Sequence, residues 1–388
     1  MELTSDQQNA LNKLIAWAKS QDKSPFITLG GYAGTGKTTL IALLYKELKK
    51  GFPNYKVAFA AYTGKAARVL RTTMVQQGAV QKGDTVGTIH SLIYSPMTNS
   101  NEEIIGWERK DKISFNLIII DEASMVDEKI WQDLLGYHIP IIAVGDHGQL
   151  PPISGHFNLM GEPEIRLEEI HRQKATNPII ELSIMARRDG YVPVGHFGKN
   201  VMKVERNSSD AQEIIDDILG NTQSDMLVLC GYNSTRVKLN QYIRGKLELF
   251  SLEPVKGDRV ICLRNNHQKQ IYNGMLGNIT SITEQDEKHY YAQIDFADDG
   301  QQFKGLILKE QFNSQQAMNF TNKRSRTLIA DLFDFGYALT VHKAQGSQAR
   351  RVVVFEERFL QMTDDMWKRW LYTALTRAEE ELFIIGNK

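Results

Sequence analysis

The chain has 388 residues, of which 42% are hydrophobic and 24% are charged, so it can bury sizeable cores and is not broadly disordered. Lysine plus arginine number 46, as do aspartate plus glutamate, and the resulting net charge of zero excludes a uniformly polycationic nucleic-acid coat but allows a local basic groove. Two cysteines, Cys230 and Cys262, exclude a disulfide framework and a four-cysteine zinc site, and they suit a reducing compartment. No apolar run approaches the roughly 20 residues of a membrane span, and the first residues lack a basic stretch followed by an apolar one. We therefore expect no membrane segment and no signal peptide.

Short apolar runs alternate with amphipathic stretches over about the first 185 residues. Apolar residues at helical spacing predict helices, and near-continuous isoleucine and valine runs predict strands of a parallel sheet covered on both faces. The predicted order is helix 3–20, strand 25–30, helix 38–50, strand 56–61, helix 65–77, strand 116–120, helix 127–137 and strand 139–145.

A segment rich in glycine and proline, 189–200, is typical of a connection between domains. The alternation then returns, with predicted strands 226–230, 351–355 and 381–385 and predicted helices 234–250 and 364–377. Between them, four strand-like runs (259–263, 275–283, 290–296 and 303–308) are separated by turn signals such as Asn273-Gly274. This pattern predicts a small all-β insert in a second α/β domain.

The segment Gly31 to Thr38 reads GYAGTGKT and fits the pattern G-x-x-x-x-G-K-[ST] between a predicted strand and a predicted helix. Its glycines let backbone N–H groups point at phosphate oxygens, Lys37 reaches the β- and γ-phosphates, and the Thr38 hydroxyl reaches Mg²⁺. The start of the following helix favours the same anions. The sequence therefore predicts a site for ATP and Mg²⁺ that involves Gly34, Thr35, Gly36, Lys37, Thr38 and Thr39.

Two carboxylates follow the apolar strand 116–120. Asp121 can hold Mg²⁺, directly or through a water molecule, and Glu122 can activate a water for attack on the γ-phosphate; alternatively, both only cap the next helix. Gln149, in GDHGQLPP after the next strand, could contact the γ-phosphate or belong to an ordinary turn. Arg172 and Arg377 are candidate arginine fingers, although an isolated arginine is more often a surface ion-pair partner.

The order of these motifs resembles that of the superfamily 1B helicases, the group that includes the RecD-like and Dda-like DNA helicases. The matching segments are TSDQQNAL, GYAGTGKTT, AYTGKAA, TIHSL, DEASM, GDHGQLPPI, LEEIHRQ, ALTVHKAQGSQ and LYTALTRA. The resemblance implies that Gln7 recognises adenine, that Gly346 belongs to the nucleotide site, and that Arg172 and Arg377 are the arginine fingers. DEASM and the Pro-Pro pair of GDHGQLPPI are similar to the branch that moves 5′ to 3′.

The resemblance also implies the fold and the nucleic-acid contacts. The expected fold is two RecA-like P-loop motor domains, 1–185 and 186–388, with a β-hairpin pin at 94–113 in the first and a small β-barrel at about 256–325 in the second. The implied contacts with DNA are Thr63, Lys65, Thr88, His90, Asn233, Thr340, His342 and Lys343. Trp107 in the hairpin could stack on the last base pair of a duplex, or it could pack the hairpin onto the first domain.

The expected function is that of an ATP-dependent DNA helicase that moves along single-stranded DNA and unwinds duplexes. Two alternatives stay open, namely an RNA helicase of the same superfamily and a nucleotide-switched ATPase that does not unwind. Expected partners are single-stranded DNA, duplex junctions, and single-strand-binding, replication or recombination proteins. We expect a monomer in the cytoplasm of a bacterial or phage-infected cell. The basic cluster 323–326 is either a phosphate contact or a solvated loop.

Overall fold

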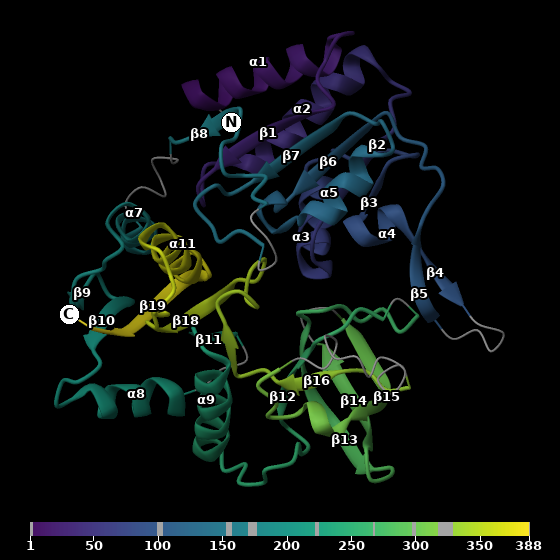
Figure 1. Ribbon diagram of the computed structural model, residues 1–388. Helices are drawn as coiled ribbons and strands as arrows, with labels where there is room; N and C mark the ends of the chain where they lie inside the picture. The colour runs from purple at the N-terminus through teal and green to yellow at the C-terminus, as the bar shows by residue number, and fades with distance from the viewer. Residues whose placement is uncertain are drawn as a thin grey trace. The chain divides into compact units, whose positions relative to one another are not determined.

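The computed structural model describes residues 3–98, 104–152, 157–169, 177–221, 225–266, 268–296, 300–316 and 329–387. The chain forms two compact units, Met1–Glu181 and Leu182–Lys388, each containing a six-stranded sheet (Figure 1). Among the described residues, no helix combines the length and the apolar character needed to cross a membrane.

The first unit has a parallel sheet of order β3-β2-β6-β7-β1-β8. Side chains of β6 alternate between its faces, because Leu117 and Ile119 pack in one apolar cluster and Ile118 and Ile120 in another. Both faces are therefore covered, as expected for strands that are apolar throughout. The elements are α1 (Ser5–Lys19), β1 (Phe26–Gly31), α2 (Lys37–Gly51), β2 (Val57–Ala61), α3 (Gly64–Gln76), β3 (Thr85–Thr88), α4 (Ile89–Ile93), β4 (Tyr94–Thr98), β5 (Ile104–Arg109), β6 (Leu117–Asp121), α5 (Glu128–Leu135), β7 (Ile141–Gly145) and β8 (Ile165–Leu167).

Strands β4 and β5 form a separate antiparallel pair, with Tyr94 opposite Arg109 and Pro96 opposite Trp107. The base of this pair is fixed to the first unit by the Tyr137 hydroxyl, which donates to the carbonyl oxygens of Ile93 (3.0 Å) and Lys110 (2.7 Å). The pair lies within the predicted 94–113 insert, whose residues 99–103 are outside the described part of the chain.

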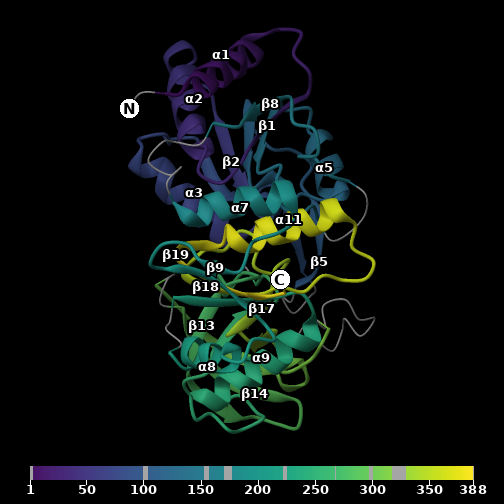
Figure 2. The same ribbon diagram turned by 90° about the vertical axis from the view of Figure 1, so that its left-hand side faces the viewer.

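The second unit has a sheet of order β17-β11-β18-β19-β10-β9, in which only β9 is antiparallel to its neighbour. Figure 2 shows α7 and α11 side by side, and Trp367 Nε1 donates to the Gly190 carbonyl oxygen at 2.8 Å. The boundary between the units falls inside α7 (Pro178–Asp189), most of which belongs to the second unit. The other elements are β9 (Gly195–His196), β10 (Val201–Glu205), α8 (Ala211–Gly220), β11 (Met226–Cys230), α9 (Asn233–Lys246), β17 (Ala338–Thr340), β18 (Ala349–Phe355), α11 (Asp364–Leu375) and β19 (Ala378–Gly386).

A five-stranded antiparallel sheet of order β15-β14-β13-β12-β16 interrupts this unit and has its own apolar cluster, which includes Ile294 and Phe303. Its strands are β12 (Arg259–Cys262), β13 (Leu276–Glu284), β14 (His289–Phe296), β15 (Gln301–Leu308) and β16 (Phe333–Phe335). A parallel bridge between Ile307 and Asp331 connects β15 to the segment that leads into β16.

Two predicted boundaries differ from the structure. The insert was expected to end near 325, but its sheet takes its last strand from Phe333–Phe335, a run too short for a periodic pattern to reveal. The segment 189–200 was expected to connect domains, but it lies inside the second unit and contains β9. Its glycines and prolines mark the turns between α7 and β10.

Candidate functional site

The predicted phosphate loop joins the end of β1 to the start of α2. Gly34 and Gly36 have φ angles of 82° and 81°, a left-handed conformation that other residues adopt only with strain. Lys37 Nζ donates to the carbonyl oxygens of Gly31 (2.6 Å) and Tyr32 (3.0 Å), so the side chain curls back along the loop. Thr38 and Thr39 lie in the first turn of α2, where backbone N–H groups have no intrahelical acceptor and favour an anion.

Gln7 lies in the first turn of α1 and is 2% exposed. Its Oε1 accepts a hydrogen bond from the Thr4 backbone N–H (3.1 Å), and its Nε2 donates to the Thr35 carbonyl oxygen (2.8 Å). This amide therefore braces the phosphate loop against the start of α1. Its adenine contact stays a prediction.

The two predicted acidic residues stand where β6 ends. Asp121 Oδ1 accepts a hydrogen bond from the Glu122 N–H (2.9 Å), and Glu122 has a φ of 53°. Burial raises the pKa of Asp121 well above its ordinary value, repulsion from Glu122 adds to the rise, and the Lys37 charge opposes it. Glu122 Oε2 and Ser124 Oγ are buried without a hydrogen-bond partner among the described residues. This edge thus holds acceptor oxygens that no described residue satisfies.

Gln149 follows β7 and is 5% exposed. Its Nε2 donates to Asp146 Oδ2 (3.3 Å), while Asp146 Oδ1 accepts from the Gly148 N–H (2.9 Å). The neighbouring His147 ring lies 4.3 Å from the Tyr32 ring, centroid to centroid, and so joins this loop to the phosphate loop. Sequence reasoning missed Asp146, although an aspartate two residues before a glycine after a strand is a recognisable turn signal.

Thr63 and Thr88 lie at the carboxyl edge of the same sheet, because Ala61 of β2 is opposite Thr88 of β3 in a parallel pair. Each caps the helix that follows: Thr63 Oγ1 accepts from the Ala66 N–H (3.2 Å) and Thr88 Oγ1 from the Ser91 N–H (3.1 Å). Lys65 is in the first turn of α3. The structure therefore brings this predicted set to two neighbouring helix starts, which suit phosphate.

His90 and Trp107 are in contact. Their rings are 5.2 Å apart and nearly perpendicular, and the His90 ring lies 4.5 Å from the Tyr94 ring. Trp107 therefore packs against α4 near the base of the β4–β5 pair. This contact is the one expected if Trp107 holds the hairpin on the first unit. Its stacking on a base pair stays a prediction.

In the second unit, the predicted contacts follow β11 and β17, which pair in parallel with Cys230 opposite Thr340. Burial lowers the pKa of His342, and burial also lowers the pKa of Lys343 to about 8. Lys343 Nζ donates to Asn273 Oδ1 in the turn between β12 and β13. The five-stranded sheet thus contacts this edge directly.

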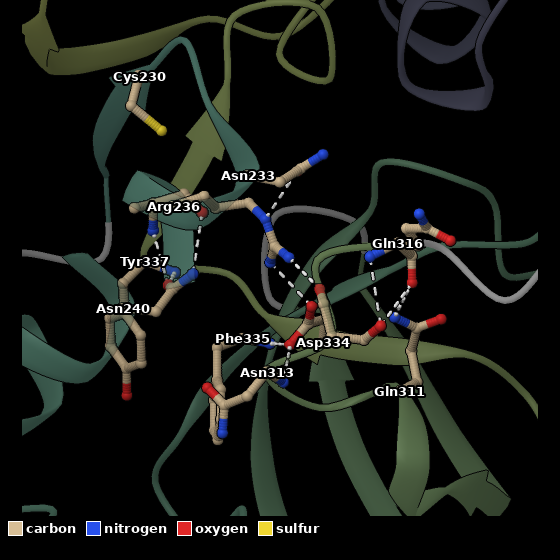
Figure 3. A network of polar contacts seen from close by, with 12 residues as sticks. Cys230, Asn233, Arg236, Asn240, Gln311, Asn313, Gln316, Asp334, Phe335 and Tyr337 are labelled. Carbon is tan, nitrogen blue, oxygen red and sulfur yellow. Dashed lines mark hydrogen bonds and ion pairs between the residues drawn. The ribbon is translucent and has the colours of Figure 1, made fainter. Parts of the chain in front are cut away.

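Asn233 begins α9 beside that edge (Figure 3). Its Oδ1 accepts a hydrogen bond from Arg236 Nε at 3.2 Å, and Arg236 is in turn paired with Asp334 of β16. Close by, Glu357 accepts hydrogen bonds from the N–H groups of Gly231 (2.8 Å) and Tyr232 (3.0 Å). Sequence reasoning missed Arg236, Asp334 and Glu357, because each is paired with a residue remote in sequence.

Arg377 is only 3% exposed. Its guanidinium donates to the carbonyl oxygens of Thr373 (3.0 Å) and Ser347 (3.2 Å) and to Thr376 Oγ1 (3.1 Å). Gly346, with a φ of 73°, precedes one of these acceptors. Two further predictions, Arg172 and the cluster 323–326, lie outside the described residues.

The chain matches the AAA domain over residues 2–200 and the UvrD-like helicase C-terminal domain over residues 335–385. It is 27% identical over 410 residues to the ATP-dependent RecD2 DNA helicase of Deinococcus radiodurans, covering 99% of this chain and 49% of that protein. It is 25% identical over 456 residues to the ATP-dependent DNA helicase dda of phage T4, covering 99% of both.

Among solved structures, the fold is similar to that of a Bacteroides Pif1 helicase in complex with ADP-AlF3 and single-stranded DNA. The TM-score is 0.53 at 18% identity, with 99% of this chain and 92% of that chain covered. At this identity the likeness concerns the fold. The chain spans about half the length of the RecD2 relative and nearly all of the phage relative.

Proposed function

The chain belongs to the AAA-domain family and to the superfamily 1B helicases, and from this premise we propose that it is an ATP-dependent DNA helicase that moves 5′ to 3′ along single-stranded DNA and unwinds duplexes. One observation supports the proposal above all. The phosphate loop, the Asp121–Glu122 pair and Gln149 follow β1, β6 and β7, which are neighbours in a parallel sheet. Carboxyl ends of neighbouring parallel strands share one edge, and ligands of α/β proteins bind at such edges.

In this proposal, Lys37 and the N–H groups of the loop bind the phosphates of ATP, and Thr38 and Asp121 hold Mg²⁺. Proteins normally hold Mg²⁺ with one or two carboxylates together with phosphate oxygens of the substrate, and the Asp121 carboxylate can serve in this way. When bound, Mg²⁺ neutralises charge on the β- and γ-phosphate oxygens. Glu122 Oε2, which lacks a partner in the described part of the chain, is suited to accept a proton from the attacking water.

Arg172 and Arg377 are proposed to neutralise the charge that develops on the γ-phosphate. For Arg377 this means exchanging its three present acceptors for phosphate oxygens. An arginine that is hydrogen-bonded within its own unit can act as a switch, because the two sets of acceptors compete for one guanidinium. Gln149 is hydrogen-bonded to Asp146 and would contact the γ-phosphate when that group is present.

Single-stranded DNA is proposed to contact Thr63, Lys65, Thr88 and His90 in the first unit. In the second unit the proposed contacts are Asn233, Thr340, His342 and Lys343. Small donor groups at strand ends and helix starts bind phosphate without reading sequence, as a translocating enzyme requires. The β4–β5 pair is proposed as the pin that splits the duplex, and the five-stranded sheet as the small β-barrel of the second motor domain.

The proposed setting is the cytoplasm of a bacterial or phage-infected cell, where the protein would act as a monomer in DNA replication, repair or recombination. Its partners would be single-stranded DNA and duplex junctions, with single-strand-binding or recombination proteins nearby. The names of the bacterial and phage relatives, both DNA helicases, support this setting.

The test is a strand-displacement assay on matched duplexes with a 5′ or a 3′ single-stranded tail, each made with DNA or RNA tails. We expect ATP-dependent displacement from the 5′-tailed DNA duplex and little from the 3′-tailed one. Displacement only from RNA-tailed duplexes would favour an RNA helicase. ATP hydrolysis stimulated by single strands without displacement of any duplex would favour a non-unwinding ATPase.

A further inference from the structure

Arg236 sets the orientation of the Asn233 side chain, which is proposed to bind single-stranded DNA. Asn233 is exposed at the start of α9, and its Oδ1 accepts a hydrogen bond from Arg236 Nε at 3.2 Å. A guanidinium can only donate, so it selects the amide orientation in which the oxygen faces Arg236. Figure 3 shows the amide nitrogen turned away from Arg236. The group left for a ligand is therefore a pure donor, because Nδ2 has no hydrogen bond within the described residues.

Arg236 is itself held from two other sides. It is 8% exposed, its Nη1 donates to Asp334 Oδ2 at 2.8 Å, and its Nη2 donates to the Ser314 carbonyl oxygen at 2.5 Å. Asp334 is 1% exposed, and its Oδ1 accepts from the N–H groups of Asn313 (3.0 Å) and Phe335 (2.8 Å). Asp334 of the five-stranded sheet and the Ser314 carbonyl oxygen thus hold the two terminal nitrogens, and Nε of the same guanidinium donates to Asn233 (Figure 3).

A second buried pair on the same helix lacks this feature. Arg244 donates to both Asp258 oxygens (2.7 and 3.0 Å) and to the carbonyl oxygen of Glu253 (2.8 Å). It also links α9 to the start of the five-stranded sheet, yet none of its donors reaches a predicted nucleic-acid contact. A buried ion pair often contributes little net stability. The Arg236 pair differs from the Arg244 pair in that one further donor of Arg236 reaches Asn233.

We propose that Arg236 and Asp334 are positioning residues for strand binding: Asp334 holds the Arg236 guanidinium, which turns the Asn233 amide so that its N–H groups face the phosphate backbone. The proposal rests on the proposed function, since it presumes a single strand at this edge. Amide N–H groups bind phosphate oxygens, and the start of α9 adds backbone donors of the same polarity. The five-stranded sheet therefore contributes, through Asp334, to the binding of single-stranded DNA.

The experiment measures the Kd of a fluorescent single-stranded oligothymidine by anisotropy. Asn233→Ala is expected to raise the Kd about 10-fold, the effect of one hydrogen bond to a charged group. Arg236→Gln is expected to raise it by a similar factor. The double variant should bind no more weakly than either single variant, because Arg236 acts through Asn233. Multiplying effects in the double variant would overturn the proposal.

Arg244→Gln is the matched control, since it breaks a buried pair on the same helix. It should lower the thermal unfolding midpoint at least as much as Arg236→Gln and leave the Kd within about twofold. Equal weakening of binding by both variants would reduce Arg236 to a structural role and overturn the proposal.

A surface variant keeps the test decisive if Arg236→Gln does not fold. Asn233→Asp retains an acceptor for Arg236 but presents an oxygen where the amide N–H groups stood. It should bind more weakly than Asn233→Ala, and equal or tighter binding would contradict the proposal. Wild-type protein that binds no oligothymidine would refute the proposed function itself, whereas wild-type binding unaffected by Asn233→Ala would refute only this inference.

Discussion

The carboxyl edges of the two six-stranded sheets differ in how their polar side chains are satisfied. At the first edge, Glu122 Oε2 and Ser124 Oγ are buried without partners in the described part of the chain, and the Glu122 backbone is left-handed. At the second edge, Asn233, Lys343 and Arg377 all hydrogen-bond within their own unit. A buried polar atom without a partner costs about 1–3 kcal/mol. The Glu122–Ser124 part of the first edge is therefore poised for a ligand that supplies the missing partners. Lys37 and Gln149, like the named groups of the second edge, are hydrogen-bonded within their own unit.

This difference predicts which variants change chemistry alone and which also change stability. Changes at the first edge should impair ATP hydrolysis with little loss of folded stability. Changes at the second edge should affect binding or hydrolysis together with stability, because each functional group there is also a structural one.

The largest expected effect is that of Lys37→Ala. Loss of the ammonium group that binds the β- and γ-phosphates should lower ATP hydrolysis by at least about 10³-fold, because this charge acts on the transferring phosphoryl group. Single-strand binding should stay within about twofold of the wild type, and the unfolding midpoint should fall only slightly, through the loss of two hydrogen bonds to loop carbonyl oxygens. Steady-state hydrolysis and anisotropy measure these quantities. A variant that still hydrolyses ATP would contradict the assignment of the phosphate loop.

Arg377→Lys should lower hydrolysis nearly as much, by about 10³-fold, because a lysine keeps the charge but not the planar fork of donors. Unlike Lys37→Ala, it should also destabilise the second unit by about 1–3 kcal/mol, since three hydrogen bonds of a buried guanidinium are lost. Urea denaturation measures the second effect. Unchanged stability would show that the contacts of Arg377 contribute nothing to the resting fold.

Trp107→Ala separates two roles within the first unit. If the indole stacks on the last base pair, unwinding should slow about 10-fold while strand-stimulated hydrolysis survives, because stacking is worth about 1–3 kcal/mol. Trp107→Phe, which keeps an aromatic ring beside His90, should retain most of the unwinding rate. Loss of both activities, or of neither, would leave Trp107 as a packing residue.

Lys343 is expected to produce a smaller effect, a dependence of the single-stranded DNA affinity on pH. Because burial lowers the pKa of Lys343 to about 8, its charge is present below that pH and is lost as the pH rises through it. The affinity for single-stranded DNA should therefore fall from pH 7 to pH 9. Binding at the higher pH should release one fewer counterion from the DNA. In Lys343→Arg, which stays charged, the decline should disappear. A decline that persists in this variant would place the titrating group elsewhere.

Asp121→Asn should abolish hydrolysis and, as its smaller effect, raise the stability of the folded chain. The raised pKa means that the folded chain favours protonated Asp121, so stability from this group is present at low pH and is lost as the pH rises through the raised pKa. At pH 7 the neutral amide should raise the unfolding midpoint by about 2–4 °C, the shift for about 1 kcal/mol. Hydrolysis should be lost, and a lowered midpoint would contradict the view that this edge is unsatisfied.

Element length and sequence separation explain part of what could be predicted from the sequence, although helices α7 and α8, of 12 and 10 residues, were also not predicted. Strand β6 and helix α2 were predicted within a few residues, because their apolar patterns span several residues. Strands β8 and β16 have three residues each, too few for any period to register. The phosphate loop is a local motif, whereas Gln7 and Thr35 meet over 28 residues and Arg236 and Asp334 over 98. Such pairings follow from topology, which a local pattern does not encode.

The central claim, that this chain moves in one direction along a single strand, is tested most directly by the release of streptavidin from biotinylated oligonucleotides. Each oligonucleotide carries biotin at one end only, and free biotin traps the released streptavidin. With ATP, we predict rapid release from the 3′ end, little release from the 5′ end, and none with Lys37→Ala. Faster release from the 5′ end, or equal ATP-independent release from both ends, would contradict the account.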